Sequence, residues 1–215
     1  MKYKIFAGTC LVLVGIFVAT SLYYKKEQAR RLGFMAQNNA STFVSDHSPT
    51  LGDDDAKVFI VEFMDPACET CASFSSLVKQ VMAASPGKIK LVIRYAPFHE
   101  GADYFVKILE AAKKQNKYWE TLDVMFKTQA YWTSHHVAQP DKIWQFLPKA
   151  GLDLDRIKRD MNDPAIVTLI EQDLADAKTL NVRKTPGFFV NGKPLEPFGW
   201  KNLYKLIQSE IDANY

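Results

Sequence analysis

Cys68 and Cys71 are the residues of this chain whose types and spacing point most directly to chemistry. They lie in the stretch EFMDPACETCA (residues 62–72), between an apolar run and a sequence with helical spacing. A cysteine at a helix N-terminus meets the positive end of the helix dipole and unpaired backbone N–H groups, which lower the pKa of its thiol. The second cysteine lies one turn further on, within reach of the first. The pair therefore indicates thiol–disulfide exchange, with Cys68 as the nucleophile.

A structural zinc site and a purely structural disulfide are the plainer uses of such a pair. Zinc needs four Cys or His ligands, and only two histidines are close together, at adjacent positions that cannot easily chelate one ion. The four histidines are His47, His99, His135 and His136. A disulfide between residues three apart closes so short a loop that it stabilises little. No metal site is expected, and His99 is expected to be a non-catalytic surface residue.

Two distant features strengthen the redox interpretation. Glu62 lies within an apolar strand-like run, so its carboxyl is expected to be buried, with a raised pKa, and able to take the proton of Cys71. Thr185-Pro186 precedes the run GFFV, and a proline at a strand entrance is a candidate cis-peptide site. The plainer alternatives are a Glu62 at an exposed strand end and an ordinary trans turn at Pro186.

The elements that position these residues follow a β–α–β, helical block, β–β–α order. Buried strands are predicted at 57–64, 88–98 and 187–190, the last followed by an Asn191-Gly192 turn and a short strand. Amphipathic helices are predicted at 69–85, 102–115, 117–129, 141–151, 153–161, 164–180 and 200–211. The predicted class is α/β, with one domain over residues 51–215 and a helical insert over about 101–181.

The first 24 residues predict a membrane anchor. Residues 5–24 contain no charged residue, and this uncharged run has about the length that crosses a bilayer. We therefore expect residues 1–24 to be a transmembrane helix or uncleaved signal; the alternative is a cleaved signal peptide and a released form. Residues 25–50 are expected to be a polar connector. More basic residues follow the span than precede it, a bias that by itself would favour a cytoplasmic domain.

The charge distribution argues against nucleic-acid binding. Residues 1–31 carry six basic residues and one acidic residue, so a net charge of +3 for the chain leaves −2 for the remainder. A near-neutral body without a basic stripe lacks the electrostatic footprint of a nucleic-acid-binding protein.

Taken together, these residues resemble the DsbA-like thiol:disulfide oxidoreductases of the thioredoxin superfamily. The resemblance runs from about residue 48 to the C-terminus and includes SPTLGDDDAKVFIVEFMDPACETC, AAKKQNKYWETLDVMF and DLADAKTLNVRKTPGFFVNGKPL. A helical block between the two halves of a thioredoxin core is typical of this subfamily. The fold implied is a thioredoxin fold with a large helical insertion, preceded here by the N-terminal helix.

The resemblance implies roles for individual residues. Cys68 would be the exposed nucleophile and Cys71 the resolving cysteine, and Glu62 falls where the family carries its buried acid. Pro186 would be the cis-proline packed against the disulfide. The Thr185 backbone would pair with an extended client peptide. Glu69 and Thr70, between the cysteines, would border the client as well.

The resemblance also implies partners and a compartment. The Cys68–Cys71 disulfide would serve without any external cofactor, acting on exported client proteins with free thiols, and a membrane redox partner would reset it. Disulfides persist outside the cytoplasm, so the domain is expected at the periplasmic face of the inner membrane, with the membrane contacted through the N-terminal helix.

The dipeptide between the cysteines departs from the strongest oxidants of the family, which carry Pro-His there. An anionic Glu69 beside Cys68 opposes a thiolate, so we expect the pKa of Cys68 to be lowered less than in those oxidants. The Cys68–Cys71 disulfide should then be less strongly oxidising than theirs. Disulfide oxidation is the leading function. The alternatives are a disulfide isomerase or reductase of the same fold, a Cu(I)-binding module using both thiols, and a glutathione-dependent transferase.

Overall fold

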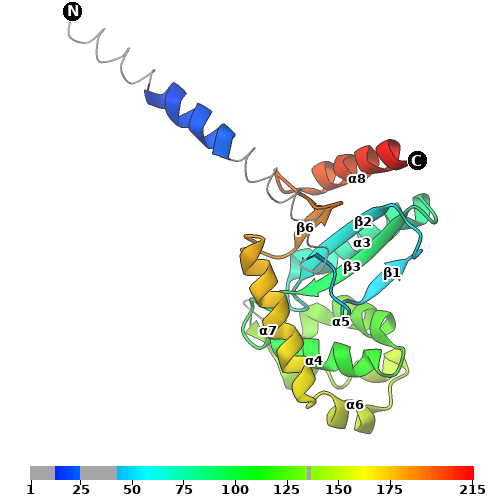
Figure 1. Cartoon of the computed structure of the whole chain (residues 1–215). Coiled ribbons are helices and arrows are strands. Elements are labelled where there is room, and N and C mark those ends of the chain that lie inside the picture. Colours follow the sequence, from blue (N-terminus) through cyan, green and yellow to red (C-terminus); the bar gives the residue numbers. More distant parts are fainter. Residues whose placement is uncertain (1–12, 25–42, 135–136) are drawn as a thin grey trace, which may run out of the picture.

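A central five-stranded sheet organises the chain, which is seen here in a computed structural model that describes residues 13–24, 43–134 and 137–215 (Figure 1). Its strand order is β1-β3-β2-β6-β7. These strands are β1 (Thr50–Gly52), β2 (Val58–Met64), β3 (Ile89–Tyr95), β6 (Gly187–Val190) and β7 (Lys193–Pro194). A separate two-stranded ribbon joins β4 (Thr133–Ser134) to β5 (Val137–Ala138).

The pairing of β2 places the two halves of the chain side by side. β2 runs parallel to β3 on one side and antiparallel to β6 on the other. The residue Glu62 is aligned with Ile93 of β3 and with Phe188 of β6. A residue about 125 positions later in the chain is thereby brought next to the strand that leads into the cysteine pair.

The helices fall into a sheet-covering set and an inserted set. Helix α3 (Glu69–Ala84) makes the crossover between β2 and β3, and α8 (Trp200–Asn214) closes the fold. The insert consists of α4 (Ala102–Lys113), α5 (Tyr118–Trp132), the 3-10 turns η1 (Pro140–Lys142) and η2 (Leu147–Ala150), α6 (Leu154–Asp160) and α7 (Pro164–Thr179). In Figure 1 the inserted helices gather below the sheet, and α8 lies at its opposite end.

Both faces of β2 are buried, which explains its nearly continuous apolar sequence. Alternate residues Val58, Ile60 and Met64 belong to the large core that also takes side chains from α3, α4, α5 and α8. Val61 and Phe63 belong to a smaller cluster on the other face, with Phe43, Val92, Ala96, Ala177, Leu180 and Phe189. Glu62 points with the first set because side chains alternate along a strand.

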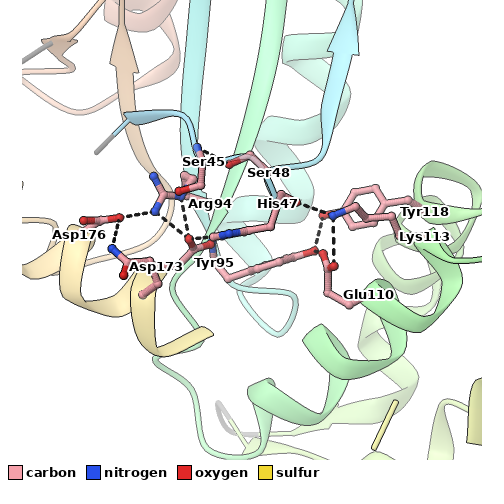
Figure 2. Close-up of polar contacts among 11 residues, drawn as sticks. Ser45, His47, Ser48, Arg94, Tyr95, Glu110, Lys113, Tyr118, Asp173 and Asp176 are labelled. Atoms are coloured by element: carbon pink, nitrogen blue, oxygen red, sulfur yellow. Dashed lines mark hydrogen bonds and ion pairs between the residues drawn. The ribbon is translucent and has the colours of Figure 1, made fainter. Parts of the chain in front are cut away.

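Helix α7 is tied to β3 by a buried ion pair. Arg94 has no exposed side-chain surface, and one of its Nη atoms lies 2.8 Å from Oδ1 of Asp173 on α7. Oδ2 of Asp173 also accepts the backbone N–H of Tyr95 at 2.7 Å, and Asp176 binds the same guanidinium. Figure 2 shows these contacts converging on Asp173, with His47 joining from the chain ahead of β1.

The segment just before β1 is part of the folded domain. Phe43 is buried against Phe189, with ring centroids 5.2 Å apart. Nε2 of His47 lies 2.7 Å from Oδ1 of Asp173, and the His47 carbonyl accepts a hydrogen bond from Lys113. A polar connector was expected over 25–50, of which 25–42 lie outside the described residues. From residue 43 onward the chain packs on the domain, and β1 was not predicted.

The helix predicted at 141–151 is wrong, because this stretch forms η1 and η2 with an irregular link between them. Pro148 lacks an N–H group and cannot complete an α-helical hydrogen bond to the carbonyl four residues earlier. The other predicted helices have counterparts in α3 to α8.

The N-terminal region is described only in part. Residues 13–24 are helical and their apolar side chains are exposed, whereas residues 1–12 of the predicted anchor lie outside the described residues. Across the parts of the chain that the structure covers, no helix is long and apolar enough to cross a membrane.

Candidate active site

Cys68 occupies the residue before the first turn of α3. Its backbone is extended, at φ −80° and ψ 116°, and its N–H donates to the Asp65 carbonyl at 3.1 Å. Its own carbonyl accepts the N–H of Ala72 at 3.2 Å, the first bond of the helix. The sulfur atom is thereby held where the unpaired N–H groups of the first helical turn converge. Both cysteines are free thiols.

The two thiols have opposite pKa shifts. The pKa of Cys68 is lowered to about 5, and the largest cause is a hydrogen bond from Cys71. Burial acts in the opposite direction, and the Thr185 side chain and the N–H groups of Cys71 and Thr70 lower the pKa further. The pKa of Cys71 is raised well above its ordinary value by burial, by the hydrogen bond to Cys68 and by the carboxyl of Glu62. Near neutral pH the pair is therefore one thiolate and one thiol, as a nucleophile and its resolving partner require.

Glu62 is a buried acid beneath this pair. It keeps 2% of its surface exposed, and burial first, then the charge of Cys68, raises its pKa to about 8. Within the described structure its Oε1 atom has no hydrogen-bond partner, and its cross-strand neighbours are the apolar residues Ile93 and Phe188. A carboxyl in this setting can hold a proton at neutral pH and exchange it with a nearby thiol.

The loop before β6 forms the other wall of the site. The Thr185–Pro186 peptide bond is cis, the isomer that the sequence predicts there. The Cys68 thiol donates a hydrogen bond to the Thr185 carbonyl oxygen, at a distance of 3.3 Å from sulfur to oxygen. Once the thiol loses its proton, the Cys71 thiol, the Thr185 side chain and the N–H groups of Cys71 and Thr70 remain to stabilise the thiolate. The pairing of β6 with β2 brings this loop to the cysteines.

His99 is the residue that sequence reasoning missed. Its Nδ1 atom lies 2.7 Å from Oδ2 of Asp65, and its backbone N–H donates to the same oxygen at 2.9 Å. Asp65 is fully buried, and its other carboxylate oxygen accepts the N–H of Ala67 at 2.7 Å. Asp65 thus joins the loop before Cys68 to the loop after β3. The signal in the sequence was an aspartate one residue after a buried strand, a position that often carries function in α/β folds.

Two cavities open beside the cysteine loop, and Cys68 lines the smaller of them. We call the smaller one, of about 350 Å³, the redox pocket; it is lined by Cys68, Glu69, Thr70, Phe98, His99, Arg183, Lys184 and Thr185. The larger one, of about 530 Å³, runs from Thr70 along the loop before β6 to Phe198 and includes Pro186. Cys68 itself is only 6% exposed, which corrects the expectation of an exposed nucleophile. The exposed part of Cys68 faces the redox pocket, which it lines.

The site residues predicted from the sequence lie together in the structure. The predicted exposure of Cys68 is the feature that differs. Glu69 and Thr70 are exposed at the pocket rim, while Pro186 is buried. The effect of Glu69 on the pKa of Cys68 stays a prediction. Within the described residues, no group of three or more His, Cys, Asp or Glu side chains is arranged to hold a metal ion. His135 and His136 lie outside those residues.

Comparison with known proteins gives a family match and several relatives. The family model described as Thioredoxin matches residues 44–209. The probable disulfide bond formation protein D of Bacillus anthracis is 25% identical over 216 residues, covering 96% of this chain and 94% of that protein. A Na(+)/H(+) antiporter NhaA of Herminiimonas arsenicoxydans is 30% identical over 144 residues, covering 67% of this chain; the match spans only 22% of the antiporter.

A solved structure extends this similarity to three dimensions. The thioredoxin-like oxidoreductase from Silicibacter pomeroyi DSS-3 superposes with a TM-score of 0.71 at 26% sequence identity, covering 82% of this chain and 99% of that one. The family-model match over residues 44–209 contains the sheet, the inserted helices and the cysteine pair.

Proposed function

Because the chain belongs to the thioredoxin family, as a DsbA-like member of that superfamily, we propose that it is a thiol:disulfide oxidoreductase. Cys68 is the nucleophile, Cys71 the resolving thiol and Glu62 the proton carrier. The observation that supports this most strongly is the opposite shift of two adjacent thiols, with the pKa of Cys68 lowered to about 5 and that of Cys71 raised. A structural pair would need no such difference.

The oxidising reaction begins from the Cys68–Cys71 disulfide. A client thiolate attacks Sγ of Cys68, the bond between the two sulfurs breaks, and Cys71 leaves as a thiolate that takes a proton from Glu62. A second client thiolate then attacks the client sulfur of the mixed disulfide and releases Cys68 as a thiolate. The client loses two electrons and gains a disulfide, and the cysteine pair is reduced. In the reverse direction Glu62 acts as the base that activates Cys71.

Thr185, Pro186, Glu69 and Thr70 contact the client. The Thr185 carbonyl points at the cysteine sulfur and offers an acceptor to an extended peptide lying across the loop. Oxidation of the client is the favoured direction, with isomerisation or reduction as the alternative. A relative named for disulfide bond formation, similar along almost its whole length, supports the oxidative assignment.

We further place the protein outside the cytoplasm. Disulfides persist in oxidising compartments, and the clients are exported proteins with free thiols. The uncharged run at 5–24, whose described part is helical with exposed apolar side chains, serves as the anchor at the membrane. Resetting of the pair falls to a membrane redox partner. A phosphatase fused to the C-terminus, active only outside the cytoplasm, tests this arrangement; an inactive fusion would overturn it.

The activity is tested with the oxidised full-length chain and a reduced polypeptide that carries two cysteines. We expect one client disulfide to form for each Cys68–Cys71 pair reduced. The Cys68→Ala variant should be inactive. Cys71→Ala, activated at Cys68 as a mixed disulfide with a small aromatic thiol, should release that thiol and stop at a mixed disulfide with a client that carries a single cysteine, visible by mass spectrometry.

A second measurement separates catalysis from metal carriage. The reduced chain is titrated with Cu(I) in competition with a chelator, alongside the exchange assay. Absence of any mixed disulfide together with tight copper binding that needs both thiols would contradict the proposed function and favour a binding module.

A further inference from the structure

Two cations line the pocket that leads to Cys68 and a third lines the pocket beside it; we call Lys178, Arg183 and Lys184 the cationic rim. Lys178 lies in the last turn of α7, and the other two immediately precede the Thr185–Pro186 loop. Arg183 and Lys184 are exposed and line the redox pocket together with Cys68. The positive charge of these two residues therefore borders the pocket that Cys68 lines.

A side pocket extends this surface away from the cysteines. It has a volume of about 180 Å³, and Lys178, Arg183 and Phe98 are among its lining residues. Phe98 and Arg183 also line the redox pocket, so the two cavities adjoin. Phe98 is 45% exposed, so the surface shared by the two pockets offers an apolar ring as well as positive charge.

Among the described residues the rim has no ion-pair partner, although Glu196 lines the larger cavity together with Arg183 and Lys184. Nε of Arg183 donates to the Asn181 side-chain oxygen at 2.8 Å, which fixes the arginine while leaving its terminal nitrogens available. In the described part of the chain no carboxylate forms an ion pair with any of the three rim residues. The two adjoining pockets contain one lining carboxylate, that of Glu69. Asp65 is fully buried beneath them and already bonded to His99.

We propose that the rim selects thiol-bearing polypeptides with acidic residues beside the reactive cysteine. This rests on the proposed function, because the acidic segment is held while its cysteine exchanges with Cys68. A carboxylate next to the client cysteine pairs with Arg183 and Lys184, and an apolar neighbour packs on Phe98. Opposite charges near an opening raise the rate of encounter more than the final affinity, so the preference is one of rate.

The test uses two synthetic peptides, each with the same pair of cysteines, flanked by Asp and Phe in one and by Lys and Phe in the other. The oxidised full-length chain is mixed with each peptide, and the second-order rate of Cys68–Cys71 reduction is followed by intrinsic fluorescence. Each rate is divided by that with dithiothreitol, an uncharged dithiol, so that changes in the cysteine pair itself cancel.

We expect the acidic peptide to react about tenfold faster than the basic one at low salt, and the ratio to fall as salt is added. Arg183→Gln with Lys184→Gln should bring the ratio close to one, whereas Arg183→Lys, which keeps the charge, should preserve it. Lys127→Gln with Lys205→Gln removes two exposed cations that line neither pocket, and should leave the ratio unchanged.

The outcomes separate this inference from the proposed function. A chain that fails to react even with dithiothreitol would contradict the oxidoreductase activity itself. A chain that reacts with dithiothreitol but shows equal peptide rates, or the same ratio after both rim substitutions, would overturn the acidic preference alone.

Discussion

The sulfur of Cys68 and the carbonyl oxygen of Thr185 lie 3.3 Å apart, although 117 residues separate them in the chain. The contact exists because β2, which leads into Cys68, pairs with β6, which follows Thr185. Everything inserted between them, from α4 to α7, is accommodated without parting these two strands. The reactive sulfur therefore lies where the N-terminal strand β2 and the C-terminal strand β6 are paired.

Removal of Cys71 should raise the pKa of Cys68. The hydrogen bond from Cys71 is the largest cause of the lowering to about 5, so Cys71→Ala should move the pKa toward the ordinary thiol value of 9.0. Cys71→Ser keeps a hydroxyl donor and should give an intermediate value. Ultraviolet absorbance of the thiolate against pH measures both. An unchanged pKa in Cys71→Ala would show that the backbone N–H groups alone control the thiolate.

Glu62→Gln should change how stability depends on pH. The folded-state pKa of Glu62, about 8, lies above the ordinary 4.5, so the stabilisation it provides is complete below pH 4.5 and is lost as the pH rises through 8. Glutamine does not titrate. The free energy of unfolding of the variant, relative to the native chain, should thus increase between pH 5 and pH 9.

Urea unfolding of both reduced proteins at several pH values measures this difference. Comparing the two proteins is necessary because Cys68 titrates in the same range with the opposite sign: its lowered pKa adds stability as the pH rises above 5. A difference between the two proteins that stays constant with pH would contradict the raised pKa of Glu62.

Asp173→Asn should destabilise the fold severely. The substitution leaves the buried guanidinium of Arg94 with less compensation and weakens the contact with His47 (Figure 2). Loss of one partner from a buried pair costs about 3–5 kcal/mol of unfolding free energy. Asp54→Asn is the matched control, since Asp54 pairs with Lys90 but is 91% exposed, and it should have little effect. Similar losses in both variants would contradict the structural role of Asp173.

Gly187→Ala should disturb the loop that carries the cationic rim. A Cβ atom at Gly187 would lie 2.7 Å from Cγ1 of Val182, too close for an undistorted fit. Overpacking of this kind costs about 1–3 kcal/mol, measurable by thermal or urea unfolding. Val182→Ala removes the colliding methyl groups, so Gly187→Ala should cost less unfolding free energy in the Val182→Ala background than in the native chain. An equal cost in both backgrounds would show that the strain does not come from Val182.

The chemistry of the site could be predicted further than its packing. A cysteine pair at a strand-to-helix boundary, a carboxylate within an apolar strand and a proline before another strand are local signals, visible from residue type together with the predicted elements. The depth of Cys68 was missed, because the walls that cover it come from loops near Phe98 and Thr185, whose approach depends on the sheet order. The Asp65–His99 pair and the Arg94–Asp173 pair join distant segments; the position of Asp65 after a buried strand is a local signal, but no local pattern identifies the partner of Asp65 or the Arg94–Asp173 pair.

Among the helices and strands too, those with a local sequence signal could be predicted and those that depend on distant contacts could not. Long amphipathic helices such as α4 and α7 follow from spacing, since their apolar positions repeat with the helical period. The three-residue strand β1 has no such signal and exists only because β3 offers it a pairing edge. At 141–151 the apolar spacing favoured a helix, but the missing N–H of Pro148 overrides it.

The docking of residues 43–49 determines where a mechanical load would enter the domain. Phe43 is wedged against Phe189, and His47 is bonded to Asp173 on α7 and to Lys113 on α4. A pull on the chain from the direction of its N-terminus therefore loads the contact of Phe43 with β6 first, then those of His47 with α4 and α7, before it reaches the edge strand β1. The segment is thus held by three separate elements, β6, α4 and α7, so a load applied to it is shared among them before β1 is pulled away from β3.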